Sequence, residues 1–310
     1  MQDGEKRSHF EVSDLKMYRS QPLSITKSGI FQFIEPSGDD YVENYEKIAA
    51  YHLDSLDQNG TNPFIGEAVW DSIDDATLEI LKTIMGPGDT ILDAGVGLGA
   101  LLRNFPDHAR YGVDVSQQYL ERIADRGIGL ALAKLENLPY KDETFDVVIS
   151  TDVLEHVIDF HAASREIVRV LKPGGHLVMR VPLEEDMEVY YNYTDFKYVH
   201  LRRFDLWTLR IQFERILGLH YVSHKPVRPV YRGIGTARVR PTDRGGDLRR
   251  IVQKLPANFH GKEELEKFSY LTPDLLNHVM NAVAGDADIF PELTEIIAND
   301  LEINVVFRKA

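Results

Sequence analysis

The sequence contains no cysteine, which excludes disulfide bonds, thiolate metal sites and cysteine nucleophiles. It also lacks any apolar run that approaches the roughly 20 residues a helix needs to cross a bilayer. Its first residues, MQDGEKRSHFEVSDLK, are polar and mixed in charge, without the apolar segment of a secretory signal. We therefore expect a cytoplasmic protein with no membrane partner.

The composition is that of an ordinary globular protein, with 43% apolar and 27% charged residues. A chain of 310 residues can bury a large core and hold one domain with a smaller cap. Its net charge of −14 would repel phosphate polymers, so we expect no nucleic-acid partner.

A basic stretch between residues 225 and 254 interrupts this acidic chain. It holds nine Lys or Arg and two Asp, a local charge of +7. Such a stretch either gathers a small anionic substrate or is a solvated loop that balances an acidic neighbour. The sequence leaves both interpretations open.

Strand-like and helix-like segments alternate along the middle of the chain. Strands are predicted at residues 90–94, 110–115, 129–135, 145–150, 176–181 and 221–225, and helices at 98–105, 116–126, 161–171 and 205–217. Another helix is predicted from a capping box at residues 72–75 to a stop at residues 86–88. This alternation is typical of a parallel sheet covered by helices on both faces. Outside it, we predict a helix at residues 41–56 and a last strand at residues 301–308.

A glycine-rich turn, DAGVGLGA, follows the first strand of this alternation. It satisfies the G-x-G-x-x-A fingerprint of dinucleotide-binding proteins, and Asp114 follows about 20 residues later, which would fit an NAD-dependent oxidoreductase. However, Asp93 lies two residues before the first glycine, where a carboxylate would repel a pyrophosphate and would suit an ammonium group. Asp114 can accept hydrogen bonds from the hydroxyls of a ribose in either case.

Further motifs follow in order: ENLPY, FDVVIS, VLEHV and LKPGG. Together with the glycine turn they resemble the class I S-adenosyl-L-methionine (SAM)-dependent methyltransferases, in the type 11 subgroup that includes ubiquinone and menaquinone biosynthesis enzymes. The resemblance covers roughly residues 70–225. It implies an α/β, Rossmann-like sheet of seven strands in the order 3-2-1-4-5-7-6, with strand 7 antiparallel, and it implies SAM as the cofactor.

The resemblance also assigns cofactor contacts. The methionine part would meet the glycine turn and the residues after strand 4, the ribose would meet the acid that ends strand 2, and the adenine would meet residues after strands 2 and 3. The residues assigned to the methionine part are Asp93, Gly95, Gly97, Thr151 and Asp152. Asp114 is assigned to the ribose, and Val115, Leu135 and Glu136 to the adenine. The family usually has an acid two residues before Glu136. This chain has Lys134 there, which cannot accept a hydrogen bond from an adenine amino group.

His156 and His200 are the candidate catalytic residues. His200 lies in the loop at residues 181–204, after strand 5, where related enzymes place substrate contacts. A histidine there can accept a hydroxyl proton near neutral pH. Each histidine also has a structural interpretation, as local packing for His156 and as an ordinary loop residue for His200. No spacing in the sequence indicates a metal site.

The predicted organisation has four parts: an N-terminal cap (1–71), a SAM-binding core (72–225), a helical, basic insertion between strands 6 and 7 (226–300) and a final core strand (301–310). We expect the insertion to select the substrate or to mediate homo-oligomer formation. The predicted function is methyl transfer to oxygen of a small-molecule acceptor that is anionic, such as an activated sugar or a secondary-metabolite intermediate. An NAD-dependent oxidoreductase and a SAM-binding, non-catalytic partner protein remain the alternatives.

If the basic stretch recognises an anionic acceptor, the double substitution Arg238→Ala and Arg240→Ala should raise the KM for that acceptor by about tenfold or more, because charged hydrogen bonds are lost. The KM for SAM should not change. Steady-state kinetics with an identified acceptor would measure both constants. An unchanged acceptor KM would favour a solvated loop.

Overall fold

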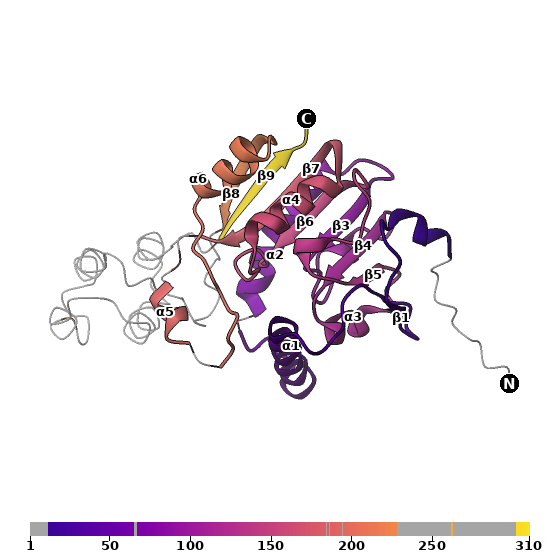
Figure 1. The fold of residues 1–310 in the computed structure, drawn as a ribbon. Helices are drawn as coiled ribbons and strands as arrows, with labels where there is room; N and C mark the ends of the chain where they lie inside the picture. The colour runs from indigo at the N-terminus through magenta and orange to yellow at the C-terminus, as the bar shows by residue number, and fades with distance from the viewer. Residues whose placement is uncertain are drawn as a thin grey trace.

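A nine-stranded sheet lies at the centre of the part of the chain that the computed structural model describes (Figure 1). That part comprises residues 12–64, 67–183, 185, 187–193, 195–227, 262 and 302–310. Seven strands form the core of the sheet: β3 (Thr90–Ala94), β4 (Ala109–Asp114), β5 (Gly129–Leu132), β6 (Phe145–Thr151), β7 (Leu171–Pro182), β8 (His220–Val227) and β9 (Glu302–Arg308). Their order is β5-β4-β3-β6-β7-β9-β8, with β9 antiparallel to both neighbours. The predicted α/β fold and its antiparallel last strand are confirmed, and these seven strands follow the predicted order, but the sheet has nine strands rather than seven.

Two short strands near the N-terminus extend the sheet beyond the seven predicted strands. β2 (Phe31–Gln32) pairs in parallel with β5, and β1 (Ser24–Ile25) pairs antiparallel with β2. Next to them, Tyr18 follows the 3-10 helix η1 (Val12–Met17) and stacks on Tyr140 at a centroid distance of 5.1 Å. Strands of two residues are too short to show an alternation of apolar and polar positions, so they could not be predicted from the sequence.

Helices cover both faces because the strands alternate apolar side chains between the two sides. One face carries α4 (Phe160–Val170), α6 (Leu206–Arg210) and the π-helix η4 (Ile211–Ile216), and the other carries α2 (Glu67–Ile84) and α3 (Gln117–Ile123). In β3, Leu92 packs in the cluster with α4 and Ile91 in the cluster with α2. In β9, Val305 and Val306 divide in the same way. The arrangement places two hydrophobic layers on one continuous sheet.

The first helix of the core starts earlier than predicted. α2 begins at Glu67, so the proposed capping box at residues 72–75 lies inside the helix and does not start it. Asp74 points instead to the guanidinium of Arg180 on β7. The motif therefore has a tertiary role that its local pattern did not indicate.

The predicted helix at residues 98–105 is wrong, because only the short 3-10 helix η2 (Leu102–Asn104) forms there. The side-chain amide of Asn104 donates to the carbonyl oxygen of Ala100 at 3.0 Å, where a helix would use a backbone donor. Pro106 also disfavours helical backbone at the residue before it.

Most other boundaries agree with the prediction to within a few residues. The helix expected at residues 41–56 is α1 (Asp40–Asn59), which the Asp39 side chain caps. The helix expected at residues 205–217 is divided into α6 and η4, and β7 begins at Leu171 rather than at residue 176. A short helix that the sequence did not indicate, α5 (Met187–Tyr191), lies in the loop after β7. Apart from residues 226, 227 and 262, the predicted insertion at 226–300 lies outside the described residues.

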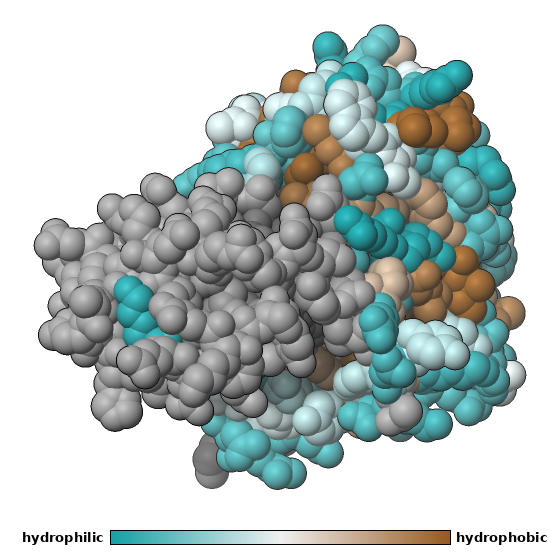
Figure 2. All heavy atoms as spheres, turned by 90° about the vertical axis from the view of Figure 1, so that its left-hand side faces the viewer, coloured by the Kyte–Doolittle hydropathy of each residue, from teal (hydrophilic) through white to brown (hydrophobic). Residues whose placement is uncertain are grey.

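On the face shown in Figure 2, hydrophobic atoms of the described part form separate patches between hydrophilic ones. Exposed large apolar side chains of the described part include Trp207, Ile216 and Val222. Within the described residues, no helix is both long enough and apolar enough to cross a membrane.

A buried arginine joins several elements of the core. Arg180, on β7, has a side chain that is only 1% exposed. Its Nη1 donates to Asp74 at 3.1 Å and to the hydroxyl of Thr77 at 2.8 Å, and its Nη2 donates to Asp152 at 2.6 Å. Its Nε forms an ion pair with Glu302, 2.8 Å from a carboxylate oxygen, but the two groups are not aligned for a hydrogen bond. One guanidinium thus links α2, the loop after β6, and β9.

Replacing Arg180 with Met should lower the free energy of unfolding by about 3–5 kcal/mol, because buried carboxylates lose their counter-charge. Arg210→Met is the matched control, since Arg210 pairs with Glu214 near the surface one helical turn away. The control should cost no more than about 1 kcal/mol. Urea unfolding followed by circular dichroism measures both values. Similar losses in the two variants would contradict the role of Arg180.

Candidate cofactor and acceptor site

Most of the predicted cofactor residues gather at the carboxyl ends of the parallel strands. Asp93 is in β3, Asp114 ends β4, and Thr151 ends β6. Gly95 has φ +96°, and a Cβ on it would lie 2.2 Å from a methyl of Val153, so only glycine fits. Gly97 has φ +46° and nothing within 4 Å of an added Cβ, so the turn presents open space beside its backbone.

The carboxylate of Asp114 is held by backbone donors. One oxygen accepts from the N–H of Gly97 at 2.9 Å, and the other accepts from the N–H of Ser116 at 2.9 Å. Burial raises the pKa of Asp114, although these hydrogen bonds oppose the increase. The fixed carboxylate keeps further lone pairs that fit the hydroxyls of a ribose. Val115, the next residue, is half-buried.

Asp93 is a buried carboxylate that lacks a hydrogen-bond partner on one oxygen. Its residue is only 3% exposed, and Oδ1 has no partner in the structure. Burial, followed by the charges of Asp74 and Asp114, raises the pKa of Asp93 well above its usual value. Buried charges need a compensating charge. A cationic ammonium group, such as the one on SAM, therefore fits this position.

Leu135 and Glu136 begin the 3-10 helix η3 (Leu135–Asn137), just beyond β5. Leu135 is buried, which suits a flat apolar ring. Glu136 accepts from the N–H of Asp159 at 3.4 Å through one oxygen, and its other oxygen is buried without a hydrogen-bond partner. That second oxygen can accept a bond from an amino group.

Lys134 points to the N-terminal helix. Its Nζ lies 2.6 Å from the carboxylate of Asp39, the residue that caps α1, and 5.5 Å from the centre of the Tyr41 ring. The hydrogen bond from Lys134 lowers the pKa of Asp39. The lysine that replaces the family's acid therefore anchors α1, and Glu136 is the nearby acid that can compensate.

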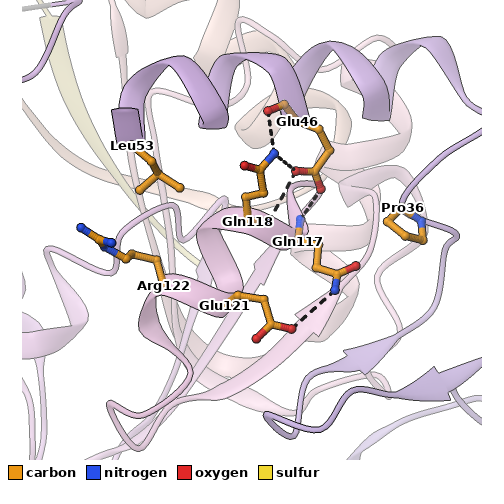
Figure 3. Close-up of a pocket in the computed structure, with 7 residues that line it drawn as sticks. All are labelled: Pro36, Glu46, Leu53, Gln117, Gln118, Glu121 and Arg122. Carbon is orange, nitrogen blue, oxygen red and sulfur yellow. Dashed lines mark hydrogen bonds between the residues drawn. The ribbon is translucent and has the colours of Figure 1, made fainter. Parts of the chain in front are cut away.

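Helix α1 bridges the cofactor residues and the loop that carries His200. Glu46 accepts from the N–H of Gln117 at 2.5 Å and from the hydroxyl of Ser116 at 3.1 Å, at the start of α3 (Figure 3). α1 also contacts the loop that carries His200: Asn44 accepts from the N–H of Lys197 at 2.8 Å, and Tyr45 donates to the carbonyl of Tyr198 at 2.8 Å. The sequence analysis predicted this helix but assigned it no contacts. Its only signal was the amphipathic pattern.

Figure 3 shows an open pocket between α1 and α3. It is lined by Pro36, Glu46, Leu53, Gln117, Gln118, Glu121 and Arg122. None of the predicted cofactor or catalytic residues lines it. We place the functional site at the strand ends because the predicted residues and the unpartnered buried acids gather there.

The two candidate catalytic histidines lie together. The rings of His156 and His200 have centroids 4.7 Å apart and meet edge to face. Tyr190 stacks on His200 at 4.3 Å, and Glu185 pairs with His200 Nδ1. On the other side, His156 Nε2 lies 3.7 Å from Glu155 Oε1. The structure therefore joins two residues that were predicted separately.

The sequence analysis missed three residues of this cluster. Glu155 is 1% exposed, and Glu185 is mostly buried. Arg202 donates to the carbonyl oxygens of Leu154 at 2.7 Å and Ile158 at 3.0 Å, which fixes the turn that holds Glu155 and His156. Glu155 was visible in the motif VLEHV, but its burial depends on tertiary packing.

Asp152 adjoins the cluster in a strained conformation. It has φ +55°, which is uncommon for a residue other than glycine. Its carboxylate is held at 2.6 Å by Arg180. The buried arginine thus stabilises the backbone between the cofactor residues and the histidines.

Comparison with known proteins bears on this site. A family model of the methyltransferase domain matches residues 92–179. The demethylmenaquinone methyltransferase of Corynebacterium urealyticum is 36% identical over 97 residues, which are 31% of this chain and 42% of that protein. The chain carries a class I SAM-dependent methyltransferase domain. The family and the cofactor expected from the sequence, SAM, are confirmed.

Two further relatives of this methyltransferase domain have different acceptors in their names. The tRNA (carboxymethyluridine(34)-5-O)-methyltransferase of Arabidopsis thaliana is 38% identical over 97 residues, covering 30% of this chain and 24% of its own. The 27-O-demethylrifamycin SV methyltransferase of Amycolatopsis mediterranei is 29% identical over 166 residues, covering 47% and 59%. Each match spans less than two thirds of the relative, so the comparisons do not identify the acceptor of this chain.

Solved structures share the fold over most of the chain. One is a chain of the Haloferax volcanii complex between the Trm112 methyltransferase activator and a methyltransferase, with a TM-score of 0.55, 18% identity, and coverage of 88% of this chain and 98% of that one. Another is the [4+2]-cyclase SpnF, with a TM-score of 0.52, 20% identity, and coverage of 89% and 98%. At these identities, both show the fold alone.

Replacing Asp93 with Asn should stabilise the ligand-free protein and weaken cofactor binding. Because its folded-state pKa is raised above the usual 3.8, the ionised carboxyl lowers stability increasingly as the pH rises from that value. The gain in melting temperature should therefore be larger at pH 7.5 than at pH 5. Affinity for S-adenosylhomocysteine should fall by about 10- to 100-fold, because a charged hydrogen bond is lost.

The control for this prediction is Asp107→Asn, which changes an exposed carboxylate just before the amino end of β4, whereas the site lies at the carboxyl ends of the strands. Thermal unfolding at the two pH values and calorimetric titration measure both effects. A destabilised Asp93→Asn protein with normal affinity would show that Asp93 has a purely structural role.

Proposed function

We propose that this chain is a SAM-dependent methyltransferase that transfers a methyl group to a hydroxyl oxygen of a small-molecule acceptor. The observation that carries this proposal is that Asp152 and the His156–His200 pair lie next to the glycine turn and to Asp93, whose Oδ1 has no hydrogen-bond partner. In this proposal the ends of β3 and β4 hold the donor, and the histidines beyond the neighbouring strand β6 accept the proton. The methyltransferase names of the matched relatives support it.

The donor half would be formed by Asp93, the glycine turn and Asp114. When bound, SAM supplies a methyl carbon attached to a positively charged sulfur, so the methyl group needs little activation. What the chain has to supply is orientation of the reacting atoms and exclusion of water. Tyr41 and Tyr45 of α1 suit the second task, because both are mostly buried beside the strand ends.

The acceptor half would be formed by His200 and its neighbours. Glu185 binds His200 Nδ1, and this contact orients the ring and leaves Nε2 to face a substrate. In the step we propose, His200 takes the proton of the acceptor hydroxyl while the oxygen forms its bond to the methyl carbon. The electron pair of the broken carbon–sulfur bond remains on sulfur. His156 packs edge-on against His200 and limits its rotation.

The anionic character of the acceptor rests on the basic stretch alone. The described part of the site is acidic, since it contains Asp93, Asp152, Glu155 and Glu185. A negatively charged group on the acceptor would therefore have to face residues 228–254, which lie outside the described residues. We propose an acceptor with a neutral hydroxyl at the histidines and its charge at a distance from them.

Two other functions are alternatives to this proposal: an NAD-dependent oxidoreductase, and a protein that binds SAM without transferring its methyl group. The NAD-dependent alternative is disfavoured by Asp93, which would face a pyrophosphate. Calorimetric titration with S-adenosylhomocysteine, NAD and NADH separates the donors. Binding of NADH alone would overturn the methyltransferase proposal.

Turnover separates an enzyme from a binding protein. The purified chain is incubated with SAM that carries an isotopically labelled methyl group, together with panels of hydroxyl-bearing and amine-bearing small molecules. Labelled product from the hydroxyl panel supports O-methylation, and product from the amine panel alone contradicts it. Tight S-adenosylhomocysteine binding with no product in either panel favours the non-catalytic alternative.

His200→Gln should lower kcat by about 10²- to 10⁴-fold, the usual contribution of a positioned base. Affinity for S-adenosylhomocysteine should stay within twofold of wild type, and the loss of rate should shrink at high pH, where the acceptor ionises without help. His220→Gln, on the exposed start of β8, is the control and should keep the wild-type rate. A wild-type kcat and pH profile for His200→Gln would exclude His200 as the base.

A further inference from the structure

A cluster of potential metal ligands lies beside the donor site. One ligand atom each from Glu155, His156 and His200 lies within 4.8 Å of the others. Two histidines and one carboxylate form a ligand set that zinc, manganese and iron use, and in catalytic sites it leaves positions open for a substrate. No spacing in the sequence predicted this cluster, because His200 is distant along the chain from Glu155 and His156.

The burial of Glu155 points to a missing ligand. Glu155 is 1% exposed, and neither carboxylate oxygen accepts a hydrogen bond from another residue. Three other acids, Asp152, Glu185 and Glu302, lie close enough to repel its charge. His156 Nε2 lies 3.7 Å from Glu155 and is charged only when protonated, and the Arg202 guanidinium attracts the carboxylate without a hydrogen bond to it. A buried carboxylate in this state is costly unless a cation binds it.

The orientation of His200 suits a metal ligand. Its Nδ1 pairs with Glu185, which leaves Nε2 as the atom that can bind an ion. A carboxylate behind a histidine is the usual outer partner of a metal-bound imidazole, because it fixes the tautomer and raises the basicity of the other nitrogen. Glu185 holds that position here.

We propose that Glu155, His156 and His200 bind a divalent cation, with Glu185 as the outer partner of His200. Ligand atoms about 2.0–2.2 Å from one ion lie about 3.3–3.6 Å apart in tetrahedral geometry. The pair at 3.7 Å already fits, and since all three ligand atoms lie within 4.8 Å of one another, no pair has to close by more than about 1.5 Å. Such a shift needs only rotation of side chains.

The cation would add a second way to activate the acceptor, and this role rests on the proposed function. A hydroxyl oxygen bound to the ion has a lowered pKa, as zinc-bound water does, so its proton leaves to solvent. In the cation-free protein, His200 takes that proton directly. Cation binding itself does not depend on the reaction and can be measured without SAM or an acceptor.

The test uses the full chain after removal of metals with a chelator. Mn²⁺, Zn²⁺ and Mg²⁺ are titrated separately by calorimetry. We expect one equivalent of Mn²⁺ or Zn²⁺ to bind with micromolar affinity. His200→Gln and Glu155→Gln should each weaken binding by at least about 10- to 100-fold, and Glu185→Gln by a similar factor, as outer-partner substitutions do. His220→Gln should bind as wild type does.

No saturable binding by the wild-type chain would overturn the inference, and so would equal affinity in wild type and His200→Gln. Circular dichroism checks that each variant is folded. If Glu155→Gln fails to fold, His200→Gln decides, because His200 lies on a loop. Methyl transfer without cation binding would overturn this inference and leave the proposed function intact. Cation binding without methyl transfer would support this inference and count against the proposed function.

Discussion

One buried guanidinium holds the site together. Arg180 crosses from β7 to contact the helix α2, the residue after β6 and the last strand, and it does so where water is excluded. Asp152 keeps its uncommon backbone conformation opposite this arginine, and that conformation sets the direction of the chain toward Glu155 and His156. Buried pairs of this kind contribute little net stability compared with apolar packing, but they fix one geometry because an unpaired charge is costly. The acceptor side of the site depends on that geometry.

The N-terminal helix gives the second constraint. α1 lies beside α3 beneath the sheet in Figure 1 and connects two separate segments, the start of α3 through Glu46 and residues 197–198 through Asn44 and Tyr45. Lys134 fixes its first turn through Asp39. The residue that departs from the family pattern therefore has a structural explanation. A family acid at that position would repel Asp39, so the lysine and the position of α1 belong together.

Acidity distinguishes this site from a dinucleotide site. The turn after β3 has the glycines of both kinds of protein, and glycine conformations alone do not separate them. Asp93 separates them, because a carboxylate buried without a partner on one oxygen suits a cation and opposes a pyrophosphate. Glu155 is likewise buried without a hydrogen bond from another residue, which favours the proposed divalent cation. In both places, an unpaired buried charge indicates which ligand is missing.

The sequence by itself determined most of the strands and helices, the glycine turn, and the motifs whose resemblance to a family implied the order of the seven core strands. These features depend on local patterns: alternating apolar residues, turn residues and motifs of fixed spacing. Only the tertiary structure decided that Asp74 pairs with Arg180, that Lys134 faces Asp39, and that His156 lies against His200. Each of these contacts joins residues far apart in the chain, where no spacing rule operates. Burial of a charge also depends on every neighbour at once, so the sequence could name Glu155 within a motif but could not show that it lacks a partner.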